Sequence, residues 1–279
     1  MTAVVVRGVT KSYGEHQALR GIDFSIAAGE VFGLLGPNGA GKTTTVEILE
    51  GYRERDAGQV EVLGEDPQRA GRGWREQVGV VLQSSSLYPN LTVRESLDVF
   101  AGYYSRPRSP GEVIALVGLE EKQDARVRTL SGGQKRRLDL GLALIGDPTL
   151  IFLDEPTTGF DPGARRQAWD TIRNLRELGK TVLLTTHYLD EAEQLADRVA
   201  VLRDGLIVRE GTPSELTGST AETEIRYRSG GEEVVERTTE PTRRLNELTG
   251  EALARGEDLD ALEVRRPSLE DVYLELTSE

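Results

Sequence analysis

Short runs of apolar residues, many of them β-branched, alternate along the chain with longer segments whose apolar positions recur at helical spacing. The short runs are typical of strands and are Val4–Val9, Val31–Leu35, Val78–Leu82, Leu150–Leu153, Thr181–Thr185 and Val199–Leu202. Several of them lack polar alternation, as strands covered on both faces do, so we expect an α/β fold with a mainly parallel sheet. Ligands of such a sheet bind at the carboxyl ends of its strands.

Helical patterns dominate the stretch between the strand that ends near Leu82 and the one that begins at Leu150. The clearest of them are Thr92–Ser105 and Gly132–Ile145. The sequence therefore predicts a helical subdomain inserted into the α/β core at about residues 84–148.

The balance of acidic and basic residues changes after Gly211-Thr-Pro213. Residues 219–279 hold 16 acidic and 8 basic side chains. Their pattern predicts a hairpin (Glu224–Arg228 and Glu233–Thr238), then a helix, a strand and a closing helix from Ser268. We therefore expect a large α/β domain of residues 1–216 and a small acidic α+β domain of residues 217–279.

Composition narrows the class of protein. With 37% hydrophobic and 29% charged residues the chain is globular, and no apolar run approaches the roughly 18 residues that span a bilayer. The N-terminal residues lack the basic, apolar and small-residue regions of a secretory signal. We expect the protein in the cytoplasm.

The cysteine and histidine content and the net charge of the chain narrow the chemistry that it can perform. The 279 residues contain no cysteine, which excludes disulfides and thiolate chemistry, and only two histidines, His16 and His187. A net charge of -13 works against binding to nucleic acid phosphates. One basic cluster stands out, and we interpret it as a solvated helical face rather than a nucleic-acid site: Arg126, Arg128, Lys135, Arg136 and Arg137.

A phosphate-binding loop is the strongest chemical signal. Gly36-Pro-Asn-Gly-Ala-Gly-Lys-Thr43 matches the G-x-x-x-x-G-K-[ST] pattern, follows the strand Val31–Leu35 and opens the helical stretch Thr44–Glu50. A glycine-rich turn with a chance lysine is the alternative, which the strand and helix context disfavours. In such a loop the backbone N–H groups and the helix start face phosphates, Lys42 adds a charge, and Thr43 can bind Mg²⁺. The expected loop residues are Gly36, Asn38, Gly39, Gly41, Lys42, Thr43 and Thr44.

A second motif completes a nucleotide site. The apolar run from Leu150 ends in Asp154-Glu155-Pro156, which delivers two carboxylates at the carboxyl end of a buried strand. Alone, this ending is equally well explained as a turn. Together with the phosphate loop it predicts that Asp154 holds Mg²⁺ through water and that Glu155 is the general base or the water-positioning group for attack on the γ-phosphate.

Leu130-Ser-Gly-Gly-Gln134 resembles the signature motif of ABC ATPases. Ser131 is a good N-cap, and an ordinary capped helix start is the alternative interpretation. The resemblance implies a dimer of cassettes, in which each ATP lies between the Lys42 loop of one chain and Ser131, Gly133 and Gln134 of the other. A second copy of this chain is sufficient as partner, because its set of motifs is complete, but it is not necessary, and a different cassette is the alternative.

The resemblance extends over residues 3–216 and assigns four more positions. It implies that Tyr13 stacks on adenine, that Gln83 contacts Mg²⁺ or the attacking water, that Asp161 lies at the cassette interface, and that His187 touches the γ-phosphate. Phe160 stands where leucine is more usual in the family.

The tail from Val264 to Thr277 resembles the C-terminal ending of ATPases from the bacterial drug- and antibiotic-exporter branch, the daunorubicin-resistance type. A closing amphipathic helix with Leu269, Val272, Tyr273 and Leu276 on one face explains the same pattern. The resemblance implies an exporter subunit on the cytoplasmic face of the membrane that powers a separate transmembrane permease. Candidate permease contacts, which core packing explains equally well, are Tyr88, Leu91, Val93, Leu97, Phe100 and Tyr103.

Two other functions are alternatives to a role in transport. A soluble ABC ATPase that acts in translation, DNA repair or cofactor assembly usually carries two cassettes or a long coiled-coil insertion, and this chain has neither. A P-loop GTPase or kinase is disfavoured because the chain lacks an Asn-Lys-x-Asp motif and leaves the Ser131 segment unexplained.

Overall fold

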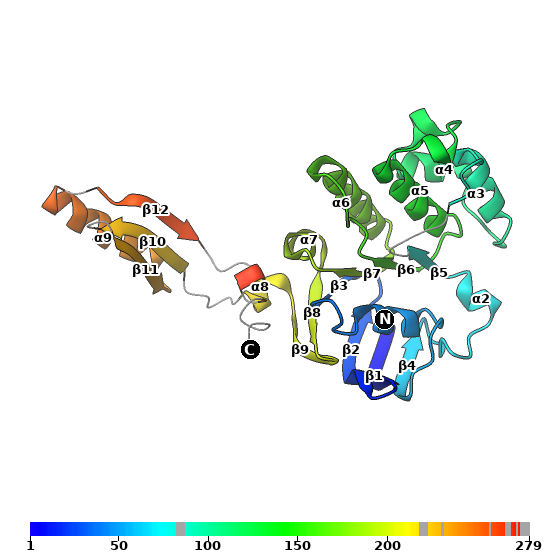
Figure 1. The fold of residues 1–279 in the computed structure, drawn as a ribbon, viewed down its shortest axis with the longest axis horizontal. Helices are drawn as coiled ribbons and strands as arrows, with labels where there is room; N and C mark the ends of the chain where they lie inside the picture. Colours follow the sequence, from blue (N-terminus) through cyan, green and yellow to red (C-terminus); the bar gives the residue numbers. More distant parts are fainter. Residues whose placement is uncertain are drawn as a thin grey trace. The chain divides into compact units, whose positions relative to one another are not determined.

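The computed structural model describes residues 1–81, 87–217, 223–229, 232–256, 258–265, 269–271 and 273. The chain divides into two compact units, Met1–Glu210 and Gly211–Glu279 (Figure 1). The predicted boundary lies slightly later, at 216/217, so the short helix α8 (Pro213–Leu216) groups with the second unit. No helix among these described residues is long and apolar enough to span a bilayer.

The larger unit is built on a mainly parallel sheet with the strand order β5-β6-β7-β3-β8-β9. The pairs β5/β6, β6/β7, β7/β3 and β3/β8 are all parallel, which confirms the predicted fold class. Every residue of β3, β6 and β7 is buried, as expected for runs without polar alternation. The strands are β3 (Val31–Leu35), β5 (Val78–Val81), β6 (Leu150–Asp154), β7 (Thr181–Thr186), β8 (Arg198–Arg203) and β9 (Leu206–Gly211).

Successive side chains of these strands point into two separate cores. Leu34 and Phe152 lie in one core with the helix α1 (Lys42–Leu49) and an antiparallel sheet. Ile151 and Leu184 lie in the other core with the helices of residues 93–144 and with α6 (Pro162–Glu177) and α7 (Leu189–Leu195). The antiparallel sheet and the helices α6 and α7 lie on opposite sides of the parallel sheet (Figure 1).

The antiparallel sheet corrects one prediction. Val4–Val9 was expected in the parallel sheet, but it belongs to β1 (Thr2–Tyr13), in a sheet of order β2-β1-β4 with β2 (His16–Ala27) and β4 (Ala57–Val62). The β1 register shifts on both neighbours just after residues 6–7, where Gly8 has a φ of 55°. This bulge interrupts the polar alternation, and the run therefore looks like a strand buried on both faces.

The predicted helical insertion comprises α3 (Val93–Ala101), α4 (Pro110–Leu116) and α5 (Gly132–Leu144), with the 3-10 turns η1 (Glu120–Lys122) and η2 (Val127–Thr129). Each of the three α-helices begins with a capping box. The caps are Thr92 with Glu95, Ser109 with Glu112, and Ser131 with Gln134.

For two candidate permease contacts the structure favours core packing, the alternative that the sequence left open. Val93 and Leu97 are fully buried on the face of α3 that packs against α4 and α5, so they form the core of the insertion. Tyr88 and Tyr103 are 58% and 65% exposed, and Leu91 and Phe100 are half-buried. Helical spacing identifies an apolar stripe without stating which neighbour covers it.

The remaining helices of the larger unit complete its layers. The long α6 (Pro162–Glu177) and the short α7 (Leu189–Leu195) follow β6 and β7. The short α2 (Arg72–Arg75) precedes β5 and buries Trp74, whose indole N–H donates to the Val62 carbonyl over 2.8 Å.

The second unit contains the predicted hairpin, β10 (Thr223–Ser229) and β11 (Glu232–Thr238), and the strand β12 (Asp260–Arg265), in the order β11-β10-β12. The helix α9 (Pro241–Arg255) packs on this antiparallel sheet through Leu248. Leu269 to Asp271 and Tyr273 are helical, whereas Ser268, Val272 and Leu276 of the predicted closing helix lie outside the described residues.

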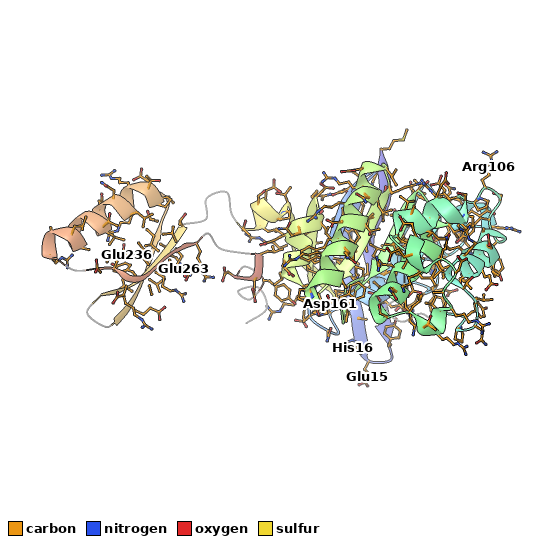
Figure 2. All side chains as sticks on the ribbon, turned by 90° about the horizontal axis from the view of Figure 1, so that it is seen from above. Glu15, His16, Arg106, Asp161, Glu236 and Glu263 are labelled. Atoms are coloured by element: carbon orange, nitrogen blue, oxygen red, sulfur yellow. The ribbon has the colours of Figure 1, made fainter. Side chains whose placement is uncertain are left out.

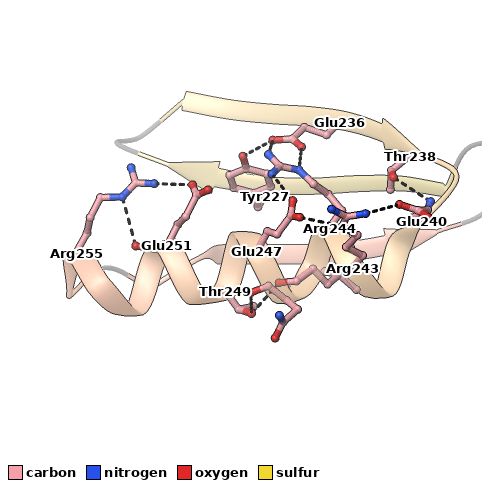
Figure 3. Close-up of polar contacts among 12 residues, drawn as sticks. Tyr227, Glu236, Thr238, Glu240, Arg243, Arg244, Glu247, Thr249, Glu251 and Arg255 are labelled. Carbon is pink, nitrogen blue, oxygen red and sulfur yellow. Dashed lines mark hydrogen bonds and ion pairs between the residues drawn. The ribbon is translucent and has the colours of Figure 1, made fainter.

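A polar cluster fastens α9 to the hairpin (Figure 3). The Arg244 guanidinium donates from Nε and Nη2 to the two carboxylate oxygens of Glu236 over 2.6 and 2.9 Å. The Tyr227 hydroxyl donates to the same carboxylate over 2.8 Å, so one acid holds a helix side chain and a neighbouring strand.

Acid should loosen this unit through Glu236. The Arg244 hydrogen bonds lower the pKa of Glu236 below its ordinary value of 4.5. Because the pKa is lower in the folded state, the pair stabilises the unit above pH 4.5, and this contribution is lost as the pH falls through the folded pKa. Glu236→Gln should therefore speed hydrogen exchange of the α9 amides at pH 7 and weaken the effect of acid on them.

Glu251→Gln is the matched control, because the Glu251–Arg255 pair is exposed and lies within one helix. Equal exchange rates in the two variants would show that Glu236 does not fasten the helix.

Candidate functional site

The phosphate loop is shaped by two glycines that no other residue could replace without rearrangement. A Cβ on Gly36 would lie 2.4 Å from the Leu202 carbonyl oxygen. Gly41 precedes α1 with a φ of 109°, and its Cβ would lie 2.7 Å from the Ala18 carbonyl oxygen. The loop can therefore run closely over β2 and β8 before it enters the helix.

Lys42 is buried in this loop, with 6% of its surface exposed. Its Nζ donates to the carbonyls of Gly36 and Pro37 over 2.7 and 3.2 Å. Burial lowers the pKa of Lys42, and the carboxylates of Glu155 and Asp154 oppose the decrease. The ammonium group thus lies in the field of both acids that end β6.

The two acids differ in environment. Asp154 is buried and its Oδ1 accepts from the Thr185 hydroxyl over 2.5 Å. Glu155 has a φ of 46°, which is unusual for a residue other than glycine, and its N–H donates to the Thr185 carbonyl over 3.1 Å. The Thr158 hydroxyl donates to Glu155 Oε2 over 3.2 Å. Bonds to the backbone and to the carboxylate thus hold this turn in place.

Arg136 departs from the interpretation of the basic cluster as a solvated face, whereas Arg126 and Arg128 are exposed as that interpretation requires. From α5 its guanidinium donates to three consecutive carbonyls, those of Asp154, Glu155 and Pro156, over 2.9, 3.3 and 3.1 Å. Arg137 donates to the Gly118 carbonyl over 2.9 Å. Burial lowers the pKa of Arg136. The reason for the error is that a side chain can reach backbone acceptors about 20 residues away, which charge patterning does not reveal.

His187 follows β7 and meets Glu155. Its Nδ1 lies 3.3 Å from Glu155 Oε1, and its ring lies 4.1 Å from the ring of Tyr188. The structure therefore brings together three predicted residues, Lys42, Glu155 and His187, at the carboxyl ends of the neighbouring strands β3, β6 and β7.

Tyr13 lies at the same edge of the unit. Its hydroxyl is 3.5 Å from the Thr44 hydroxyl, and the Arg53 guanidinium lies 5.1 Å from the centre of its ring. Glu47 holds Arg53 through an ion pair of 2.5 Å. A partly exposed ring next to the phosphate loop suits stacking with a purine.

Tyr13, the phosphate loop and Glu155 line one open pocket. Two further lining residues, His16 and Ala18, were not among the predicted site residues. His16 pairs with Tyr13 at the tip of the β1–β2 hairpin (Figure 2). Recognition of Tyr13-Gly-Glu-His16 as a hairpin turn would have found it. The predicted residues in the pocket are Tyr13, Asn38, Gly39, Gly41, Lys42, Thr43, Thr44 and Glu155.

Other predicted site residues lie at helix starts. Ser131 and Gln134 form the capping box of α5, as the N-cap prediction for Ser131 requires, and Gly133 lies in its first turn. Asp161 caps α6, and its Oδ1 accepts from the N–H groups of Gly163 and Ala164 over 2.8 and 2.9 Å. Gln83 lies outside the described residues.

The residues present suit a magnesium ion. Mg²⁺ prefers hard oxygen ligands, takes one or two carboxylates from the protein and completes its shell with phosphate and water. Thr43 offers a hydroxyl at the start of α1, and Asp154 offers a buried carboxylate held by Thr185. Among the described residues there is no group of three or more histidines and acids that could hold a metal ion by itself.

Removal of the Arg136 guanidinium should destabilise the larger unit. Arg136→Met leaves three carbonyls of the β6 turn without this donor, so we expect a loss of about 2–4 kcal/mol in the free energy of unfolding. Arg137→Met is the control, with a loss of about 1 kcal/mol or less, because it removes one exposed hydrogen bond. Urea unfolding monitored by the fluorescence of Trp74 and Trp169 measures both, and equal losses would contradict this role of Arg136.

Known proteins are similar to this chain in sequence over nearly its full length. A family model described as ABC transporter matches residues 19–158. The Nod factor export ATP-binding protein I of Paraburkholderia xenovorans is 43% identical over 288 residues, which cover 96% of this chain and 95% of that protein. The protein of the same name from Rhizobium sp. (strain N33) is 43% identical over 295 residues, 99% of this chain and 97% of that protein.

Solved structures share the fold. An ATP-binding cassette of an ABC transporter in its ADP conformation matches 77% of this chain and 92% of its own, with a TM-score of 0.68 and 25% identity. A dimeric ATP-binding cassette in a post-hydrolysis state, bound to ADP and Pi, matches 75% of this chain and 98% of its own, with a TM-score of 0.67 and 28% identity. The chain therefore belongs to the ABC transporter family and is an ATP-binding cassette that hydrolyses ATP.

Proposed function

We propose that this chain is the nucleotide-binding subunit of an exporter and that it powers a separate transmembrane permease from the cytoplasmic face of the membrane. The proposed ATP hydrolysis rests on one observation. Lys42, Glu155 and His187 lie close together at the carboxyl ends of three neighbouring strands. Export is supported by the full-length relatives named as Nod factor export ATP-binding proteins.

In this proposal Glu155 accepts a proton from the water that attacks the γ-phosphate, and His187 holds the carboxylate and contacts the phosphate. The 3.3 Å approach of His187 Nδ1 to Glu155 Oε1 supports this pairing. Lys42 and the loop N–H groups would balance phosphate charge, and Tyr13 would stack on adenine. Bound Mg²⁺, held by Thr43, Asp154 and Gln83, would neutralise charge on the phosphates.

A second cassette, here a second copy of this chain, would complete the site. Ser131, Gly133 and Gln134 lie at the start of α5, where backbone N–H groups favour an anionic ligand, and Asp161 lies at the start of α6 as the proposed interface residue. The described pocket around Lys42 contains none of the four. Dimeric cassettes among the similar structures support closure of two chains on ATP.

The drug- and antibiotic-exporter branch is the finer form of the proposal and rests on the tail after Val264, most of which lies outside the described residues. The permease would contact the exposed Tyr88 and Tyr103 beside α3. A soluble ABC ATPase without a permease remains the alternative. No nucleic acid is expected, given the net charge of -13.

Glu155→Gln tests the catalytic assignment. Glutamine keeps the shape of the side chain but cannot accept the proton, so the ATPase rate should fall at least about 100-fold while ATP binding persists. Light scattering should then show a dimer that forms with Mg-ATP, and Lys42→Ala should weaken nucleotide binding. Glu121→Gln, on the exposed turn η1, is the control. A Glu155→Gln protein with wild-type turnover would remove Glu155 from the reaction.

Affinity purification tests the transporter assignment. Tagged Glu155→Gln protein, isolated from native membranes with Mg-ATP, should bring with it a multi-span polypeptide that has no ATPase domain. Reproducible recovery of ribosomal, DNA-repair or other soluble partners alone would favour the non-transport alternative.

A further inference from the structure

Glu191 is a buried acid that the proposed mechanism does not use. It lies in α7 and is 0% exposed. Its Oε1 accepts from the Thr157 hydroxyl over 2.9 Å and from the Trp169 indole N–H over 3.0 Å. Its Oε2 makes no hydrogen bond of good geometry among the described residues, although the nearby Thr186 hydroxyl, next to His187, lowers the pKa of the carboxyl against the effect of burial. Burial of such a group is costly, and a leucine of similar size would fill the space at less cost.

The location of Glu191 explains why a hydrogen-bond acceptor is kept at this position. Thr157 is fully buried and stands two residues after Glu155, in the turn that leaves β6. Glu191 stands four residues after His187, in the helix that leaves β7. The Thr157–Glu191 hydrogen bond therefore joins the two segments whose side chains meet at Glu155 Oε1 and His187 Nδ1.

The same carboxylate is tied to a third element. Trp169 belongs to α6, the helix that begins after Asp161. Two further contacts hold α7 on α6, from Arg173 to Gln194 over 3.2 Å and from Arg165 to Asp190 over 3.5 Å. The attachment of α7 to α6 is thus shared among several bonds, and the Thr157–Glu191 bond extends the attachment to the turn after Glu155.

We propose that Glu191 is a positioning residue for ATP hydrolysis: through Thr157 it sets the distance between the Glu155 carboxylate and the His187 ring. The proposal rests on the roles given above to Glu155 and His187. Displacement of reacting groups by about 1 Å can cost about 100-fold in rate. The bonds from Thr185 to Asp154 and Glu155 hold the strand ends together, and the Thr157–Glu191 bond adds a tie beyond them, so its loss should lower kcat by less than that.

A matched pair of variants tests this role. Thr157→Val and Trp169→Phe each remove one donor to the same Glu191 oxygen. Valine keeps the volume of threonine, whereas phenylalanine keeps an aromatic ring but is smaller than tryptophan, so any loss from a cavity falls on the control. We expect Thr157→Val to lower kcat about tenfold at an unchanged KM for ATP, and Trp169→Phe to keep kcat within about twofold. Urea unfolding of both proteins reports whether the fold is equally stable.

Substitution of the acid itself gives the second test. Glu191→Gln keeps an oxygen that can accept from Thr157 and should retain most of the activity, whereas Glu191→Leu should lose it to the same degree as Thr157→Val. A wild-type kcat in Thr157→Val, or equal losses in Thr157→Val and Trp169→Phe that follow their stabilities, would overturn the proposal. Glu155→Gln is measured in parallel: if it is inactive while Thr157→Val turns over normally, only the positioning role fails.

Discussion

The catalytic edge of this cassette depends on how three carbonyl groups at the end of β6 are satisfied. The turn at Asp154-Glu155-Pro156 leaves the sheet with a strained φ at Glu155, so its carbonyls no longer pair with a neighbouring strand. The Arg136 guanidinium donates a hydrogen bond to each of the three carbonyls. Because Arg136 belongs to α5, the helix that Ser131 caps, the helical insertion and the α/β core share one rigid contact at the chemical site.

Much of this arrangement could be predicted from the sequence, for definite physical reasons. β3 is a short apolar run that ends at the glycine-rich loop, and β6 is a short apolar run that ends at Asp154, so the ends of both strands could be located closely. The carboxyl ends of neighbouring parallel strands meet at one edge of a sheet, and Lys42 and Glu155 were therefore expected together. His187 was placed by resemblance to a family, because a lone histidine after a strand has no intrinsic meaning.

Other features depend on distances that no local pattern contains. Val4–Val9 has the apolar character of a buried parallel strand, and only its pairing with β2 and β4 places it in the antiparallel sheet. Leu97 and Tyr103 both belong to the apolar stretch around α3, yet the first is fully buried and the second is largely exposed. Arg136 is one of several cations in sequence, and its partners lie about 20 residues further along the chain.

The cap of α6 has a consequence for any molecule that approaches it. Asp161 is exposed, and both of its described bonds, from Gly163 and Ala164, end on Oδ1 (Figure 2). Two N–H groups of the helix therefore fix the rotamer of this carboxylate before anything binds. A donor that reached Oδ2 would meet an acceptor whose side-chain entropy is already lost, so the contact would form at a lower entropic cost than at a freely rotating surface aspartate. The helix start thus makes Asp161 a preorganised acceptor at the surface of the protein.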